Sequence, residues 1–508
     1  MAKKKLISSC CLLLCLLTLL SLAVSCGGSN ANEVPQTTGN DVTENTEPEE
    51  SGTESPYDEN GFLKDSLDGI YYNGTEVKII TWDNNPYLFP LQQDESERFV
   101  SLVYKRDRYL EDKLGLYFDI TRKTSSASAD KEHANALYNA MLSGTEAYDV
   151  CAAYGVWPPY MAFQGMLYDL NTLNYPETDK PWYSETSQWE VYNRLFYIAS
   201  NSSVSSFNSM KIIYANTTLI KNSQLEDVVE VVLNGGWTLE RMLDYSRNWA
   251  NEAQEHPDDH IYGVLWGHRV MMEGFFYSAG FHSTVKDADG LPQLAYTDPG
   301  TVERIDNFVE TIRTIMNSPE CHILQKADMS HVVNHKTVFY AATLDNIIEI
   351  AGDKDITIIP FPKLDEEQEE YYTSRDHGYD MFCVPVTTSD PQIGAVIIEA
   401  IASTDYRMIG PEYFDRNMKH RYSNSDSGIR IFELIRDSIT VDFATANYKP
   451  LGGAIIENVL RDCVYPWTHG GADGPVYDGQ NFASRLETVI QSHKDALLAL
   501  QKVYYNFK

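Results

Sequence analysis

The stretch EVKIITW, Glu76–Trp82, decides the fold class of this chain. Its centre is apolar and β-branched, which is typical of a strand buried on both faces. The strand ends in an aromatic residue, and the polar run DNN at 83–85 follows at once. Such a run after a buried strand predicts a strand end that faces solvent or a ligand.

Two further segments of the same kind follow at short intervals. LYFDITRK at 116–123 and YDVCAAYG at 148–155 are strand-like, and apolar residues recur at helical spacing over 98–114 and 131–142. Strands and helices that alternate at these lengths predict an α/β layer with parallel strands. In such sheets ligands bind at the carboxyl ends of the strands.

The rest of the chain continues this mixture of strands and helices. Thr238 is predicted to be the N-cap of a helix that begins in NGGWTLERM. Helices are also predicted over 299–316, 393–403 and 480–506, and strands in KIIYAN, DITIIP and DMFCVPV.

Length and charge limit the classes of function. A chain of 508 residues exceeds one ordinary core, so two domains or two large lobes are expected. The formal net charge is −33, from 73 acidic and 40 basic residues, and this argues against binding of nucleic acid. It also disfavours a strongly anionic solute unless a local basic pocket exists.

The N-terminus has the pattern of a secretory signal. Lys3–Lys5 precede the apolar run 6–24, and small residues lead to Cys26. This pattern resembles the lipobox of bacterial lipoproteins, which implies a signal peptide over 1–25 and a lipid on the thiol of Cys26. Ala23 departs from the leucine that is usual at the third position before the cysteine, and an uncleaved anchor is the alternative.

Residues 26–74 are predicted to be the lipidated cysteine and a disordered acidic tether. Bulky apolar residues are nearly absent from Gly27 to about Asn60, so this segment buries too little surface to offset the entropy of ordering. About thirty residues of flexible chain reach on the order of 30 Å.

Four cysteines lie beyond Cys26: Cys151, Cys321, Cys383 and Cys463. They are widely spaced and form no C-x-x-C pair, so no zinc site built on thiolates is expected. We predict mostly buried free thiols, no metal site and no cofactor.

The order of motifs resembles family 1 extracellular solute-binding proteins of ABC importers, the maltose-binding-protein-like group. The resemblance is carried by VKIITWDNN, YDVCAAYG with GMLYDLNTL, KPWYSE, MKIIYANTTLI, NGGWTLERM, HKTVFYAATLDN, ITIIPFPK and MFCVPVTTSDPQIGAVIIEAIAS. Each piece is weak alone, but their order over more than 400 residues argues against chance.

The resemblance implies an α/β, two-lobed periplasmic-binding-protein-like fold of type II. Each lobe is then a sheet flanked by helices, with hinge crossings between the lobes. The implied N-lobe holds 75–199 with 379–425, and the C-lobe holds 200–378 with 426–508. A ligand in the cleft closes the lobes about the hinge.

The same resemblance, together with the strand ends, predicts the residues that contact ligand. Aromatic rings stack on sugar rings, while carboxylate and amide groups bind hydroxyls. Core packing is the alternative for Trp82, and a turn cap for Asn208. The predicted ligand-binding residues are Trp82, Asp83, Asn84, Tyr154, Trp157, Asn208, Trp266, Tyr277, Asp345 and Asn346.

The resemblance implies a lipid-anchored, non-enzymatic receptor of an ABC importer that faces the extracytoplasmic side of the cell membrane. Its expected partners are a small solute, with a carbohydrate favoured, and the permease subunits, and we expect a monomer. The number of aromatic residues favours a sugar, while a peptide or another polar solute stays open. The alternatives are a tethered glycoside hydrolase, which needs two carboxylates about 5–10 Å apart, and a surface glycan-binding module without a transporter.

Overall fold

The protein is described by a computed structural model. It describes residues 55–83, 85–126, 132–144, 148–183, 186–249, 260–324, 326–350, 353–413, 426–453, 455–464 and 480–506. The chain divides into two units, Met1–Pro56 and Tyr57–Lys508, and the described helices and strands belong to the second. The predicted signal peptide and Cys26 lie outside the described residues, so their predictions stay untested.

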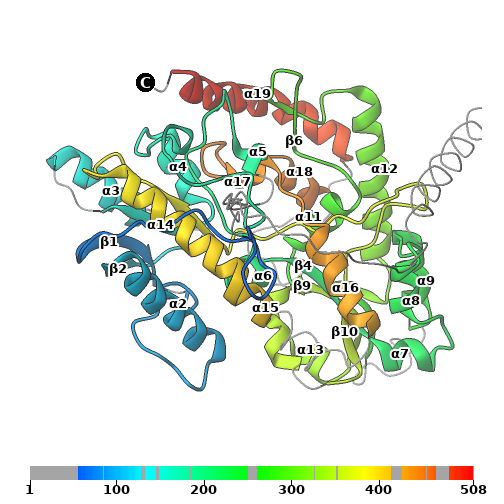
Figure 1. Ribbon diagram of the computed structural model, residues 1–508. Coiled ribbons are helices and arrows are strands. Elements are labelled where there is room, and N and C mark those ends of the chain that lie inside the picture. Colours follow the sequence, from blue (N-terminus) through cyan, green and yellow to red (C-terminus); the bar gives the residue numbers. More distant parts are fainter. Residues whose placement is uncertain are drawn as a thin grey trace, which may run out of the picture. The chain divides into compact units, whose positions relative to one another are not determined.

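The first sheet contains the stretch that decides the fold (Figure 1). Its strand order is β11-β3-β1-β2, with β1 (Thr75–Trp82), β2 (Leu116–Lys123), β3 (Val150–Tyr154) and β11 (Asp380–Cys383). β1 pairs in parallel with β2 and with β3, as the alternation of strands and helices predicts. β11 is antiparallel to β3 and comes from more than 200 residues further along the chain.

Four helices pack against this sheet: α2 (Arg98–Leu114), α3 (Glu132–Ser143), α4 (Trp157–Phe163) and α14 (Pro391–Thr404). α2 and α14 contact each other, and so do α3 and α4. α2 ends at Gly115, whose φ of 62° is in the left-handed region that favours glycine.

The second sheet has the strand order β10-β4-β9-β5-β8. Its strands are β4 (Lys211–Asn216), β5 (Tyr262–Trp266), β8 (Cys321–Ile323), β9 (Thr337–Thr343) and β10 (Ile356–Ile359). β5 is parallel to β8 and β9, whereas β4 is antiparallel to β9 and β10. The purely parallel arrangement expected from the alternation therefore does not hold throughout.

Helices surround the second sheet, some packed directly on its strands and others on those helices, and a two-stranded ribbon lies beside them. These elements are α7 (Thr217–Asn222), α8 (Val228–Leu233), α9 (Leu239–Arg247), α11 (Met271–Ser278), β6 (Thr284–Lys286), β7 (Pro292–Leu294), α12 (Pro299–Met316), α13 (Ser330–Val333), α16 (Asp426–Asp437), α18 (Ile455–Val464) and α19 (Phe482–Asn506). The short connecting elements are η1 (Leu170–Thr172), α5 (Thr186–Trp189), α6 (Val204–Asn208), η3 (Leu344–Ile350), η4 (Asp405–Ile409), α15 (Gly410–Glu412) and α17 (Phe443–Ala446).

Several helix boundaries follow from capping chemistry. The hydroxyl of Thr238 accepts a hydrogen bond from the backbone N–H of Arg241, which confirms Thr238 as the N-cap of α9. α12 spans the predicted 299–316 because Asp298 caps it and Pro299 is its first residue. The four described cysteines are buried free thiols, as predicted.

The chain passes between the two sheets more than once. The segment Thr373–Tyr379, here called the crossing segment, connects β10 in the second sheet to β11 in the first. Its Ser374 carbonyl accepts from the backbone N–H of Lys211 at 2.9 Å, and its His377 carbonyl accepts from that of Gly155 at 3.2 Å. The crossing segment is therefore hydrogen bonded to both lobes.

The C-terminal helix α19 also contacts both lobes (Figure 1). It packs against α12 and α18, while its last turn lies against loop residues that precede the first crossing from sheet to sheet. There the Tyr504 hydroxyl donates to the Tyr197 hydroxyl at 3.1 Å, and the Tyr504 ring packs edge-on to Phe196 at 5.2 Å.

The folded part begins earlier than residue 75, where the sequence placed its start. Residues 57–74 belong to the second unit and pack against it. Leu67 is buried, and the Asp65 carboxylate binds Lys113 at 2.9 Å, the Ser403 hydroxyl at 3.0 Å and Arg407. Composition did not reveal this because the segment is attached by specific contacts, those of Leu67 and Asp65 among them, and not by a long apolar run.

No helix among the described residues is both long and apolar enough to cross a membrane.

Glu399 on α14 makes stability depend on pH. The residue is fully buried, and its carboxyl group accepts from the Trp182 indole N–H and the Glu177 backbone N–H, each at 3.0 Å. Burial raises the pKa of Glu399 to about 7 from its usual 4.5. The folded protein thus keeps a proton that the unfolded chain releases, and the stability from this proton is full below pH 4.5 and is lost as pH rises to about 7.

Glu399→Gln should remove this pH dependence, because its side chain is uncharged at every pH. We expect the free energy of unfolding of the variant, relative to wild type, to rise by about 3 kcal/mol between pH 4.5 and 7. Urea denaturation of both proteins across this range measures the change. A constant difference would show that the pKa of Glu399 is the same in the folded and unfolded states.

Candidate functional site

Two aromatic side chains meet where β1 and β3 end. Trp82 is the last residue of β1 and Tyr154 the last of β3, and these strands are neighbours. Their rings pack edge to face, with centroids 5.2 Å apart. Trp82 is buried and Tyr154 half-buried, so the pair lies at the margin of the first lobe's core.

Asp380, the first residue of β11, fixes this strand end. Its Oδ1 accepts from Trp82 Nε1 at 2.8 Å and from Asn85 Nδ2 at 2.7 Å. Its Oδ2 accepts from the Ser205 hydroxyl at 2.6 Å, on the first segment that passes between the sheets. The carboxylate therefore holds the end of β1, the start of β11 and α6 together.

The crossing segment packs directly on Tyr154 and Gly155. A Cβ at Gly155 would lie 3.0 Å from the His377 carbonyl oxygen and 3.1 Å from the Tyr379 ring. The absence of a side chain thus lets the crossing segment lie against the end of β3. His377 in turn packs on Tyr448, with ring centroids 5.2 Å apart.

We call Trp82, Tyr154, His377, Tyr379 and Tyr448 the aromatic cluster. Lys449 follows it, with its Nζ 5.0 Å from the centre of the Trp157 ring. The Trp157 indole N–H donates to the Ser126 carbonyl at 3.1 Å, and Trp157 opens α4 just after β3. The sequence therefore assembles rings from both strand ends, from the crossing segment and from the loop after α17.

Charges beside the cluster change how its groups titrate. Burial, together with the charges of Lys211 and Lys449, lowers the pKa of His377 to about 4 against the opposing effect of Asp376. His377 is thus neutral at physiological pH. Burial raises the pKa of Tyr154, and the charge of Asp376 adds to this rise, so Tyr154 keeps its proton and can donate a hydrogen bond.

The structure brings together three of the predicted ligand-binding residues: Trp82, Tyr154 and Trp157. Asp83 is exposed and turns to the neighbouring strand end, where it accepts from the Thr124 hydroxyl at 2.8 Å. Asn84 lies outside the described residues.

Asp345 and Asn346 stand at the end of β9 and bind each other, with Asn346 Nδ2 donating to Asp345 Oδ1 at 2.6 Å. Desolvation by neighbouring groups, and in addition the charge of Asp376, raises the pKa of Asp345 although part of the residue is exposed. Asp345 is therefore within electrostatic range of the crossing segment.

Two other predicted ligand-binding residues, Trp266 and Asn208, contact side chains of the fold. Trp266 is buried in the second lobe, stacked on Phe275 with centroids 5.0 Å apart, because the last residue of a central strand packs under α11. The Asn208 side chain accepts from the Tyr413 hydroxyl at 2.8 Å.

Tyr277 is buried, and its hydroxyl donates to Glu457 at 2.6 Å. Its surface nevertheless lines a small pocket with residues of the crossing segment.

That pocket contains groups that sequence reasoning missed. It is lined by Arg375 and Tyr379 of the crossing segment and by residues next to α17, and its volume of about 20 Å³ suits a single water molecule. The only sequence signal was the polar and aromatic run SRDHGYD at 374–380, which stands before a strand and has no helical or strand periodicity.

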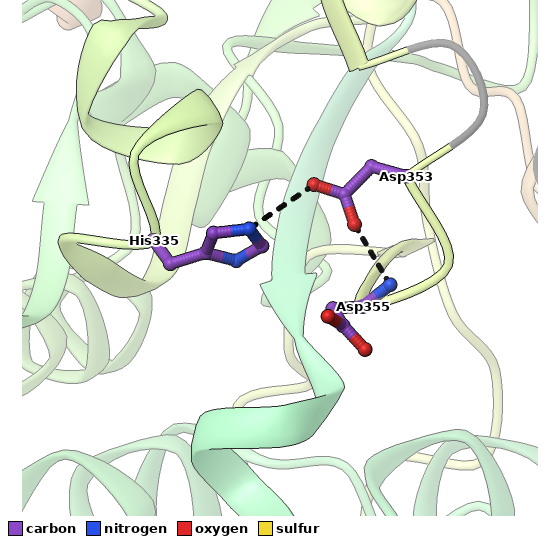
Figure 2. Close-up of side chains that lie close together, drawn as sticks. All are labelled: His335, Asp353 and Asp355. Carbon is purple, nitrogen blue, oxygen red and sulfur yellow. Dashed lines mark hydrogen bonds and ion pairs between the residues drawn. The ribbon is translucent and has the colours of Figure 1, made fainter.

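A histidine and two carboxylates also lie close together elsewhere, at the edge of the second sheet (Figure 2). Ligand atoms of His335, Asp353 and Asp355 all lie within 4.8 Å of one another. Each has a partner in the fold. His335 Nδ1 lies 2.9 Å from Asn216 Nδ2, Asp353 accepts from the Asp355 backbone N–H at 2.9 Å, and Asp355 accepts from the Thr218 hydroxyl at 2.7 Å. These contacts give the three residues a structural role, because they connect the end of β4 to the loop before β10.

Comparison with solved structures identifies the class of fold. The described architecture matches type II periplasmic-binding-protein-like structures with two lobes, the fold of ABC transporter sugar-binding proteins. No protein-family model matches the sequence, and no curated protein matches it. The resemblance inferred from the motifs is confirmed at the level of fold.

Three solved structures illustrate the likeness. The galacto-N-biose and lacto-N-biose I-binding protein of an ABC transporter from Bifidobacterium longum has a TM-score of 0.54 at 10% identity, covering 84% of this chain and 98% of that one. The sugar-binding protein MalE from Xanthomonas citri has a TM-score of 0.54 at 11% identity, covering 85% and 99%. A cyclo/maltodextrin-binding protein complexed with maltotetraose has a TM-score of 0.52 at 12% identity, covering 83% and 97%.

The role of Asp380 is testable by substitution. Asp380→Ala leaves the Trp82, Asn85 and Ser205 donors without their acceptor, so we expect the free energy of unfolding to fall by about 3 kcal/mol. Asp437→Ala, at the exposed end of α16, is the control, for which we expect a change below about 0.5 kcal/mol. Urea denaturation followed by tryptophan fluorescence measures both, and equal effects would show that Asp380 does not hold the strand ends together.

Proposed function

We propose that this protein is a lipid-anchored, extracytoplasmic solute-binding receptor of an ABC importer. It captures a sugar or oligosaccharide between its lobes and delivers it to the permease without chemical change. The observation that carries the proposal is the aromatic cluster, which lies at the carboxyl ends of β1 and β3 against a segment that crosses between the lobes.

The cluster has the chemistry that sugar recognition uses. Rings supply apolar faces for pyranoses, and the Tyr154 hydroxyl and the neutral His377 imidazole supply hydrogen-bonding groups for hydroxyls. The fold supports the same assignment, since the similar solved structures include proteins that bind lacto-N-biose and maltotetraose.

The crossing segment offers a route from binding to lobe movement. It hydrogen bonds to Gly155 in the first lobe and to Lys211 in the second, and it contributes His377 and Tyr379 to the cluster. A ligand that contacts these two residues therefore interacts with the part of the chain that bends when the lobes close. The pocket beside them suits one water molecule, so a sugar ring enters only when the lobes separate.

Screening by thermal shift with mono- and oligosaccharides tests the receptor assignment. A specific saccharide at about a hundred times its Kd should stabilise the folded protein by about 2.7 kcal/mol and be recovered intact. Recovery of a hydrolysed product would instead support a glycoside hydrolase. Binding without closure, measured by X-ray scattering, would support a surface glycan-binding module.

The aromatic cluster makes a prediction of its own. Tyr154→Ala removes the half-buried ring at the end of β3, and we expect affinity for the saccharide to fall about 10- to 100-fold in isothermal titration calorimetry. Tyr138→Ala on α3 is the matched control, because Tyr138 is 48% exposed and lies outside the cluster. An unchanged affinity in Tyr154→Ala would place the ligand elsewhere.

The anchor is tested separately from the ligand. Cys26→Ser removes the thiol that a thioether-linked lipid requires, so we expect the protein to move from the membrane fraction to the medium or the periplasm. Cys151→Ser, at a buried thiol, should leave the protein in the membrane fraction. Retention of Cys26→Ser in the membrane would show that an uncleaved apolar segment anchors the chain.

A further inference from the structure

Arg375 occupies an unusual place in the crossing segment. The residue is 6% exposed, and its backbone forms an isolated bridge with Met210, the residue just before β4. Its carbonyl oxygen accepts a hydrogen bond from Lys211 Nζ at 3.2 Å. The backbone is therefore fixed where the chain passes between the lobes, and the side chain is held at the small pocket that it lines with Tyr277 and Tyr379.

The guanidinium group of Arg375 has no hydrogen-bond or ion-pair partner in the part of the chain that the structure describes. Its Nε, Nη1 and Nη2 atoms are all buried, and none of them hydrogen bonds to any residue within the described ranges. The guanidinium carbon lies over the Tyr379 ring, 4.7 Å from its centre. Stacking on a ring leaves the N–H groups at the edge of the guanidinium plane unused.

A second unpaired donor lines the same pocket. The Ser374 hydroxyl is buried and makes no hydrogen bond with a described residue. Folded proteins rarely leave buried polar atoms unsatisfied, and two adjacent residues in one pocket that lack a partner among the described residues indicate a site that a ligand can fill.

The carboxylate among the residues that line this pocket already has its hydrogen-bond partners. Asp442 also lines the pocket, but its two oxygens accept four hydrogen bonds, from the backbone N–H groups of Ser283, Thr284 and Ala444 and from the Thr284 hydroxyl. A carboxylate has about four lone-pair positions, so none is left for the guanidinium group.

We propose that Arg375 and Ser374 bind a carboxylate group of the transported solute, which makes the ligand an acidic saccharide of the uronic-acid type. The inference rests on the proposed receptor function and specifies its substrate class. A planar guanidinium group matches the two oxygens of a carboxylate, and the serine hydroxyl adds a third donor. A neutral sugar hydroxyl accepts hydrogen bonds from such a group but leaves its charge uncompensated.

The placement of the pocket fits a terminal acidic group. Tyr379 belongs to both the pocket and the aromatic cluster, so a sugar ring over the cluster positions its carboxylate beside Arg375. The formal net charge of the chain is −33, and a local cation in the cleft offsets the repulsion that this surface exerts on an anionic solute.

Paired ligands test the inference on the full-length protein. Glucose- and galactose-based mono- and disaccharides are each compared with the counterpart that carries a carboxylate in place of the C6 hydroxymethyl group. In isothermal titration calorimetry we expect at least one uronate to bind about 10-fold or more tightly than its neutral partner. Arg375→Gln should weaken uronate binding about 100-fold and abolish this preference, and Arg375→Lys should lose about 10-fold because it keeps the charge without the planar fork.

Controls separate recognition from folding. Arg430→Ala removes an exposed positive charge on α16 and should leave both affinities unchanged. Ligand-free Arg375→Gln should melt no lower than wild type, because it removes a buried cation that no described residue pairs with. A large fall in its melting temperature would show that the guanidinium group is structural and would overturn the inference.

The failures of the two proposals are distinguishable. Tight binding of a neutral saccharide with no preference for its uronate overturns the acidic-ligand inference and leaves the receptor function intact. Binding by neither class overturns both. If the preference for the uronate persists in Arg375→Gln, another cationic group binds the carboxylate, and the proposed role of Arg375 is wrong.

Discussion

The buried carboxylate of Asp380 is the interaction on which the rest of the site depends. It stands at the start of β11, a strand that joins the first sheet only after the chain has built the second. By accepting from Trp82, Asn85 and Ser205, it joins three segments that are far apart in sequence. Burial raises the pKa of Asp380, while these hydrogen bonds favour the ionised form. The orientation of the Trp82 ring is thus set by a residue almost 300 positions away.

Much of the fold was predictable because it depends on local chemistry. The β-branched residues of β1 predict a strand within a few positions. In the same way, Asp298 followed by Pro299 predicts the start of α12. The antiparallel pairing of β11 on β3, and of β4 on its neighbours, is different in kind, since strand direction is set by the path of the whole chain. Leu67 packs into the core and Asp65 binds Lys113, Ser403 and Arg407, and a composition argument does not detect such specific contacts.

The candidate site likewise contains residues that the sequence predicts and residues that depend on tertiary packing. Trp82, Tyr154 and Trp157 were predictable because the ends of adjacent parallel strands must meet. Trp266 also ends a strand, but whether a ring at that position faces a cleft or a covering helix depends on tertiary packing, and here Phe275 of α11 covers it. Arg375 was not predictable, because what distinguishes it from the other arginines is the lack of a partner within the described fold, and no sequence pattern encodes that.

The position of α19 has a consequence for how far the lobes can travel. Its body packs on helices of the second lobe, whereas Tyr504 in its last turn is bonded to Tyr197 of the first. Any separation of the sheets must either break this tyrosine pair or draw the loop around Tyr197 along with the helix. The distance by which the lobes can separate therefore depends on the contact between Tyr504 and Tyr197 as well as on the bending of the crossing segment.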